Sequence, residues 1–162
     1  LAQNMTGLRL SPDDAYFIMR GLRTLDVRLD RHEKNTNLIV KFLSKKKNIE
    51  VLYPYKKNSK NYKLWKKYYS GANGLFSVVI KSKKKSSVIK FVNSLELFGI
   101  GYSWGGFESL VLLQELRTNT KYTQTRQYLK FAKDEHIVRF HIGLEDPRDL
   151  IADLKKSLRY IK

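Results

Sequence analysis

A long segment without proline near the amino terminus constrains the fold more than any other feature of this sequence. Residues 11–14 are Ser-Pro-Asp-Asp, which favours a helix start because serine can cap, proline suits the first turn and acids complement the helix dipole. No proline follows until after Leu43, so we predict one long helix, interrupted near Gly21. Its apolar residues keep an approximately helical spacing: Leu22, Leu25, Leu29, Ile39, Phe42 and Leu43. A helix of this length in 162 residues is typical of an element that connects or braces domains.

The sequence changes character after residue 48, where short strands and helices alternate. β-Branched and aromatic residues gather between glycine, proline and asparagine, and they predict strands at 49–53, 75–80, 97–102 and 137–142. A short helix or a turn is expected at 62–69. Helices are expected at 86–95, with Val88, Ile89, Val92 and Leu95 inward, and from Asp146-Pro147 onward, with a loop at 119–130. This order predicts a small α/β sandwich, in which a short, mainly antiparallel sheet carries helices on one face.

The amino-acid composition excludes several classes of protein. Cysteine is absent, which excludes disulfides, thiolate metal sites and thiol catalysis and suits a reducing cytoplasm. The longest apolar run, at 74–80, is too short to span a bilayer, and we identify no signal peptide. We therefore expect a cytoplasmic protein with no membrane partner. The chain opens on Leu1 rather than Met, which suits a fragment, a processed chain or a trimmed one.

The formal net charge of +17 raises the question of a nucleic-acid partner. Lysines form short runs at 45–47, 56–57, 66–67 and 83–85, and no spacing of aromatic residues around them matches an RNA- or DNA-binding motif. We interpret the runs as solvated faces and expect no specific nucleic acid, only non-specific attraction to polyanions at low salt. A basic binding module stays open as an alternative.

No complete catalytic constellation occurs in the sequence. There is no Cys/His cluster, no HExxH motif and no phosphate-binding loop, so we expect no metal site. His32, His136 and His141 are scattered along the chain, and we interpret them as surface or packing residues.

Residues 101–110 are a more informative segment, because they place Ser103 and Trp104 between glycines. Glycine lets a backbone approach a ligand closely and leaves amide groups free to bind an anion. The alternative is a tight turn that ends a strand and buries the indole.

Residues 138–146 are the second such segment, because Arg139 lies in the middle of an apolar strand. A charge there needs a partner, and the planar guanidinium suits a carboxylate in bidentate fashion. The alternative is a structural ion pair, with Glu145 or Glu108 as the candidates.

These two segments carry a resemblance to a known family. Tyr-Ser-Trp-Gly-Gly-Phe-Glu-Ser-Leu at 102–110 and Arg-Phe-His-Ile-Gly-Leu-Glu-Asp at 139–146 resemble paired signatures of the Cys/Met-metabolism family of pyridoxal-phosphate (PLP)-dependent enzymes. Residues 71–77 resemble its small-domain strand, and 20–25 are similar to its helix leaving the cofactor domain. Most members have leucine at the position of Trp104, and tryptophan there resembles the bacterial cystathionine β-lyases.

The resemblance implies a long connecting helix plus a small α/β sandwich domain, as in the carboxy-terminal domain of fold-type I PLP-dependent enzymes. Residues 1–47 would form the end of the PLP-binding large domain and the connecting helix, and 48–162 the carboxy-terminal small domain. The intact family implies a homotetramer. Without the large domain, the apolar face of the helix lacks cover, so we expect self-association or disorder before about residue 20.

The resemblance also implies roles for residues. Arg139 would bind the substrate α-carboxylate, and Ser103 and the Trp104 amide would help to hold the same group. The Trp104 side chain would line the substrate side of the pocket. No catalytic residue is expected here, because the family's PLP-binding lysine lies upstream and no Ser-x-Thr-Lys context occurs in this chain.

The implied whole enzyme is a carbon–sulfur lyase of methionine biosynthesis and transsulfuration. It would convert cystathionine to homocysteine, pyruvate and ammonia with PLP bound by the missing upstream domain. The isolated segment is expected to be inactive. The alternatives are a related cystathionine γ-synthase or γ-lyase segment, or a basic binding module on the same fold.

Overall fold

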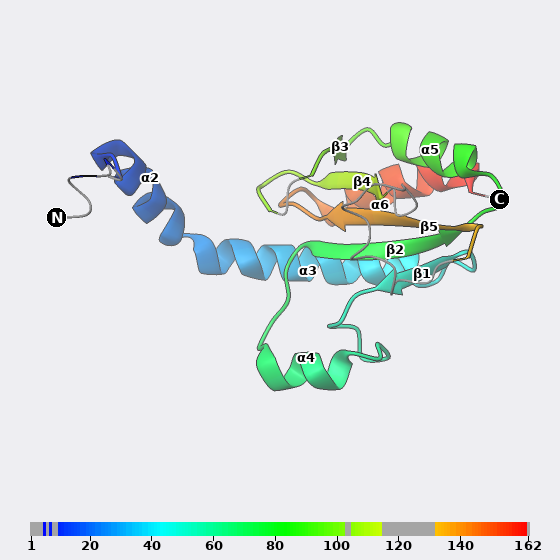
Figure 1. The fold of residues 1–162 in the computed structure, drawn as a ribbon, viewed down its shortest axis with the longest axis horizontal. Coiled ribbons are helices and arrows are strands. Elements are labelled where there is room, and N and C mark those ends of the chain that lie inside the picture. The colour runs from blue at the N-terminus through cyan, green and yellow to red at the C-terminus, as the bar shows by residue number, and fades with distance from the viewer. Residues whose placement is uncertain (1–4, 6, 8–9, 103–104, 115–131, 162) are drawn as a thin grey trace.

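The computed structural model describes residues 5, 7, 10–102, 105–114 and 132–161. One sheet with a layer of helices forms the body of the molecule, and a helical arm projects from it (Figure 1). The predicted fold class, a long helix plus a small α/β sandwich, is confirmed. None of the described helices is long and apolar enough to cross a membrane.

The arm consists of α2 (Pro12–Leu22) and the first half of α3 (Leu25–Leu43). The side chain of Ser11 caps α2 as predicted, accepting a hydrogen bond from the Asp14 amide at 3.0 Å. The two helices part just after Gly21, where the interruption is predicted, and Arg28 Nη2 donates to the Gly21 carbonyl oxygen at 2.6 Å. No residue of α2 is buried.

The second half of α3 belongs to the body of the molecule. Its buried residues recur every three or four positions and face the sheet: His32, Asn35, Thr36, Ile39, Val40 and Leu43. One helix thus joins the arm to the core. The predicted domain boundary after residue 47 stays a prediction.

Five strands form the sheet in the order β1-β2-β5-β4-β3. They are β1 (Ile49–Leu52), β2 (Leu75–Lys81), β3 (Gly99–Ile100), β4 (Leu110–Gln114) and β5 (Glu135–His141). Every pair is antiparallel except β3 with β4. The central strand is therefore β5, with β2 on one side and β4 on the other.

The core lies between the sheet and the helices α3, α5 (Lys85–Asn93) and α6 (Pro147–Ser157), the last of which continues into η2 (Leu158–Tyr160). The strand predicted at 137–142 is found as β5, in which Val138 and Phe140 are fully buried and pair with Val78 and Phe76 of β2. Burial of each such side chain contributes about 1.5–3 kcal/mol. On the opposite face, β5 presents Arg139.

Two predictions for this region need correction, and one strand was missed. Within 97–102 only β3 pairs with another strand, because the Asp153 carboxylate instead accepts the amides of Glu96 and Leu97 and ties the start of this segment to α6. In α5 the inward position is taken by Phe91, whereas Ile89 is 40% exposed. Strand β4 was not predicted at all.

Candidate functional site

The candidate site is the open face of β5 together with the glycine-rich segment that follows β3. Arg139 lies between Ser77 of β2 and Leu112 of β4, the two strands that flank it. The side chain is partly buried, and its Nη2 donates to the Tyr102 carbonyl oxygen at 2.8 Å. A strand that is central to the sheet thus fixes the guanidinium beside one end of the glycine-rich segment.

The ion pair considered for Arg139 is wrong for the described residues. No carboxylate in that part of the chain, from Glu145 or Glu108 or elsewhere, lies within salt-bridge distance of the guanidinium. Because a guanidinium has five N–H donors, one bond to a carbonyl oxygen leaves donors for a ligand. A partly buried arginine without a counter-charge suits an anion, above all a carboxylate that accepts two parallel bonds.

Ser103 and Trp104 fall outside the described residues, so their assigned roles stay predictions. The structure does describe both flanks of this pair. On one flank Gly101 N donates to the Val111 carbonyl oxygen at 3.3 Å, and on the other Leu144 N donates to the Phe107 carbonyl oxygen at 2.8 Å. Both flanks are therefore attached to the sheet or to the turn that follows β5.

Glu145 holds the end of the glycine-rich segment. Its two carboxylate oxygens accept from the Ser109 amide at 2.6 Å and the Ser109 hydroxyl at 2.9 Å. The same hydroxyl oxygen accepts from Gly143 N at 2.9 Å. A Cβ at Gly143 would collide with Glu145 Oε2 and with the Phe107 carbonyl oxygen, so this close approach requires glycine.

Asn35 connects α3 to the same turn. Its Nδ2 donates to the carbonyl oxygens of Gly143 at 3.0 Å and Glu145 at 2.8 Å, and the residue is buried. The sequence interpretation missed both Asn35 and Ser109. The available signal was Asn35 itself, because asparagine in a helix interior has poor propensity and, when buried, needs partners.

Two of the three histidines meet in the structure although they are far apart in the sequence. The rings of His32 and His141 lie 5.2 Å apart, and both residues are buried. His136 lies elsewhere, with Nε2 3.1 Å from the Ser82 carbonyl oxygen. Surface or packing roles were predicted for all three, and the structure buries His32 and His141. Among the described residues, no group of His, Asp or Glu could hold a metal ion.

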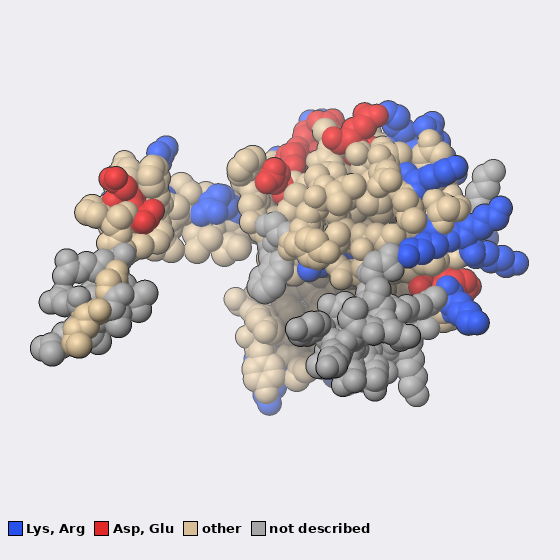
Figure 2. Space-filling model, turned by 45° about the horizontal axis from the view of Figure 1, so that its top comes forward, with Lys and Arg blue, Asp and Glu red and all other residues tan. Residues whose placement is uncertain are grey.

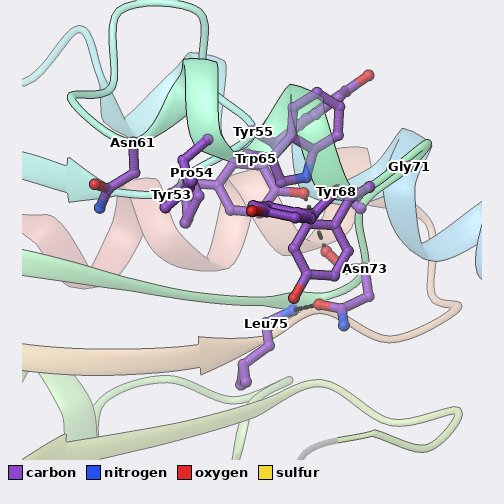
Figure 3. A pocket seen from close by; sticks show the side chains of 12 residues that line it. Tyr53, Pro54, Tyr55, Asn61, Trp65, Tyr68, Gly71, Asn73 and Leu75 are labelled. Atoms are coloured by element: carbon purple, nitrogen blue, oxygen red, sulfur yellow. Dashed lines mark hydrogen bonds between the residues drawn. The ribbon is translucent and has the colours of Figure 1, made fainter.

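A pocket lies between α4 (Tyr62–Tyr68) and the start of β2 (Figure 3). The pocket has a volume of about 580 Å³, and no charged residue lines it. Its aromatic residues include Tyr53, Tyr55 and Trp65, with Tyr55 and Trp65 packed edge to face at 4.6 Å. Because the lining has no cation, this pocket does not suit a carboxylate as Arg139 does.

The positive charge gathers away from the helical arm. Figure 2 shows lysines and arginines over the end of the body that lies farthest from α2. Lys81, Lys83 and Lys84 line a shallow hollow before α5. All three lysines are exposed, which agrees with the interpretation of the lysine runs as solvated faces.

Comparison with known proteins places this arrangement in a family. The model of the Cys/Met metabolism PLP-dependent enzymes matches residues 1–159. The chain belongs to this family. The resemblance on residues 102–110 and 139–146 is thereby confirmed.

Individual members of the Cys/Met family differ in the activity that they are named for. The cystathionine beta-lyase of Bordetella avium is 40% identical over 157 residues, covering 96% of this chain and 38% of that protein. The L-alanine/L-glutamate racemase of Wolbachia pipientis wMel is 36% identical over 154 residues, covering 94% of this chain and 37% of that one. This chain therefore spans less than half the length of these relatives.

A solved structure agrees with the fold of this Cys/Met family chain. Cystathionine gamma synthase from Xanthomonas oryzae pv. oryzae, in complex with aminoacrylate and cysteine, superposes with a TM-score of 0.81 at 28% identity. The match covers 98% of this chain and 41% of that structure.

Proposed function

We propose that this chain is the carboxy-terminal, substrate-carboxylate-binding part of a PLP-dependent carbon–sulfur lyase of the cystathionine β-lyase type. The observation that carries the proposal is Arg139, partly buried, fixed at Tyr102 and without a carboxylate partner among the described residues. The reaction would convert cystathionine to homocysteine, pyruvate and ammonia. The absence of cysteine supports a cytoplasmic location.

The role of this chain would be to orient the substrate. Arg139 would bind the α-carboxylate with two parallel hydrogen bonds, and Ser103 with the Trp104 amide would bind the same group. Fixing that carboxylate fixes the direction of the Cα–H bond, and such positioning can lower a barrier substantially. PLP, when bound, supplies the electron sink for loss of that proton and elimination of the thiol.

The described residues offer a substrate anchor rather than a complete cofactor site. Arg139 suits a carboxylate, and the aromatic pocket at Trp65 has no charged lining for a phosphate. We therefore place PLP and its lysine in the part of the relatives that this chain does not span, and we expect this chain alone to be inactive. Treatment with PLP and borohydride should leave no stoichiometric label on any single lysine, and one defined modified lysine would overturn this placement.

Two alternatives of reaction type stay within the same family. A γ-synthase or γ-lyase segment would need the same carboxylate anchor, as would a racemase such as the Wolbachia pipientis wMel relative. Trp104 favours the β-lyase, because tryptophan there resembles the bacterial β-lyases. A basic binding module is favoured only by the net charge of +17.

A chimeric enzyme tests the proposal directly. This chain would replace the matching segment of the Bordetella avium cystathionine beta-lyase, and pyruvate release from cystathionine would be measured. We expect turnover, and we expect Arg139→Ala to reduce kcat/KM about 100-fold or more, because a partly buried charge contact is lost. Arg139→Lys should recover only part, since an ammonium cannot form the fork.

The control is Arg148→Ala, which removes an exposed arginine that pairs locally with Asp146. It should leave kcat/KM within about twofold, as expected for a surface charge pair. A folded, PLP-loaded chimera that releases no pyruvate but interconverts alanine enantiomers would favour the racemase alternative. Equal activity of the wild-type and Arg139→Ala chimeras would contradict the carboxylate anchor.

A further inference from the structure

The lysines of this chain are unevenly distributed along the sequence. Between Glu50 and Glu96 there is no acidic residue, whereas eleven lysines occur there. Six of the eleven lie in the short segment 56–67, which leads into α4 and forms most of it. Glu33 of α3 contacts the residues on either side of this segment, and its single charge leaves a large excess of positive charge. Such a surface attracts a polyanion.

The pocket beside α4 places aromatic rings next to these lysines (Figure 3). None of the described residues that line it is charged, and each of the six lysines lies within two positions of a lining residue in the sequence. Lys67 shows the contact most directly, because its Nζ lies 5.2 Å from the centroid of the Tyr68 ring. The surface is therefore an uncharged aromatic hollow with positive charge beside it. The rings that line the hollow are Tyr53, Tyr55, Trp65, Tyr68 and Tyr69.

The lining of the pocket suits a nucleobase. The volume of about 580 Å³ has room for such a ring. Tyr68 and Tyr69 are 64% and 66% exposed, so their rings are accessible for stacking. Asn61 and Asn73 add amide groups, which both donate and accept hydrogen bonds as the edge of a base does. Stacking on aromatic side chains tolerates any base, so the surface selects no particular sequence.

An anionic membrane is the other partner that attracts positive charge together with exposed apolar rings. A helix bound to a membrane needs an apolar face that projects into the lipid. In α4, which has only seven residues, Leu64, Trp65 and Tyr68 line a hollow instead. A concave aromatic surface fits a strand whose bases turn inward while its phosphates stay outside with the lysines.

We propose that the segment 55–69 is a sequence-independent binding surface for single-stranded nucleic acid. Bases stack on the rings of the aromatic pocket, and the lysines of 56–67 contact the phosphates. This property is separate from the carboxylate site on β5 and does not rest on the proposed function. It agrees with the absence of a sequence-specific nucleic-acid motif, but it differs from a uniform attraction by the whole +17 surface.

Fluorescence anisotropy of a labelled single-stranded oligothymidylate of about eight nucleotides tests the stacking on the complete 162-residue chain. An abasic oligonucleotide of equal length has the same phosphates without the bases, and we expect it to bind about tenfold more weakly. Tyr68→Ala should weaken oligothymidylate binding about fivefold or more and leave the affinity for the abasic strand unchanged, whereas Tyr68→Phe keeps the ring and the affinity. Tyr16→Ala removes a tyrosine that is 60% exposed on the arm, and this matched control should change neither affinity.

The salt dependence of the affinity tests the lysines. Joint replacement of Lys66 and Lys67 by alanine should make the slope of log affinity against log salt concentration shallower by about 1.4, because each phosphate contact on a single strand contributes about 0.7. Joint replacement of Lys83 and Lys84 by alanine removes the same charge from a different hollow and should leave the slope unchanged.

Equal affinity for the two oligonucleotides would overturn the proposal, because charge alone would then explain the binding, and so would equal effects of the two lysine pairs. Cosedimentation with phosphatidylserine vesicles that is lost in Tyr68→Ala, with oligothymidylate binding unchanged in that variant, would assign the surface to a membrane and overturn the proposal as well. The comparison of the two oligonucleotides uses the wild-type chain, so it decides the question even where a variant fails to fold. None of these outcomes depends on pyruvate release by the chimera.

Discussion

At the residue scale, Glu145 allows the site to be tested without catalysis. Replacing it with alanine removes the acceptors of the Ser109 amide and hydroxyl, and hydrogen bonds to charged groups each contribute about 1.5–3 kcal/mol. We expect Glu145→Ala to lower the free energy of unfolding by about 2–4 kcal/mol in urea denaturation. Glu108→Ala is the matched control, because Glu108 is exposed and should change stability by less than about 0.5 kcal/mol. Equal effects of the two variants would contradict the assigned network.

His141 makes a prediction about pH at the same scale. Burial, with a smaller effect of His32, lowers its pKa below the ordinary value of 6.5. The unfolded chain therefore binds the proton first as pH falls, so stability should decrease from about pH 6.5 downward until the folded-state pKa is reached. Glu145 and the Gly106 carbonyl oxygen act in the opposite direction but do not reverse the shift.

His141→Gln should remove this part of the pH dependence, because glutamine does not titrate. The measurement is urea denaturation from pH 5 to pH 7.5 on the wild-type chain, on His141→Gln and on His136→Gln. The last variant removes a histidine that lies apart from the site. A pH dependence that persists in His141→Gln and disappears in His136→Gln would refute the assignment.

At the scale of elements, α4 lies apart from the sheet (Figure 1). The segments before and after α4 are both held by Glu33 of α3. Its carboxylate accepts from the Tyr55 hydroxyl at 2.8 Å on one side and from the Ala72 amide at 2.8 Å on the other. The first of these bonds raises the pKa of Tyr55. The Glu33 carboxylate thus holds together the two ends of the segment 55–72, which contains α4 and most of the lining of the aromatic pocket.

We expect Glu33→Ala to loosen the segment 55–72 while the sheet stays folded. Trypsin should cut at the lysines of 56–67 about tenfold faster, since losing the clamp lowers the free energy of local opening by about 1–2 kcal/mol. Mass spectrometry of the early fragments gives the sites and the rates. Glu50→Ala, which removes an exposed carboxylate from β1, should leave the rate unchanged. Faster cutting throughout β2 and β5 would show instead that Glu33 supports the whole core.

Elements with a local signal could be predicted from the sequence. The β-branched and aromatic residues of β5 and the Asp146-Pro147 start of α6 are local signals, and both elements are found. Strand β4 was missed because its five residues become a strand only by pairing with β5 and β3, partners that lie far away or are very short. Asn35 lies about 110 residues from the carbonyl groups to which it donates, so the sequence could mark the residue but not its partners.

At the scale of the whole molecule, the arm and the body have opposite surface properties. Lysines gather on the body (Figure 2), whereas the arm that projects from it (Figure 1) exposes apolar side chains along both of its helices. The most exposed of them include Tyr16, Phe17, Leu22 and Val27, each at least 60% exposed. An apolar surface of this kind favours association.

We expect the chain to self-associate through this arm. Burying one leucine-sized side chain contributes roughly 1.5–3 kcal/mol, so two copies that cover several of them gain enough for a dimer at micromolar concentration. Leu25 and Leu29 are 37% and 44% exposed, and their joint replacement by glutamate should shift the mass measured by light scattering from dimer to monomer. Circular dichroism should show the sheet and its helices intact, because neither leucine belongs to the buried core.

Leu64→Glu is the matched control: this leucine is 59% exposed on α4, away from the arm, and its replacement should leave the dimer unchanged. A strictly monomeric wild-type chain would contradict the association, and unfolding of the double variant would show that the arm is part of the core.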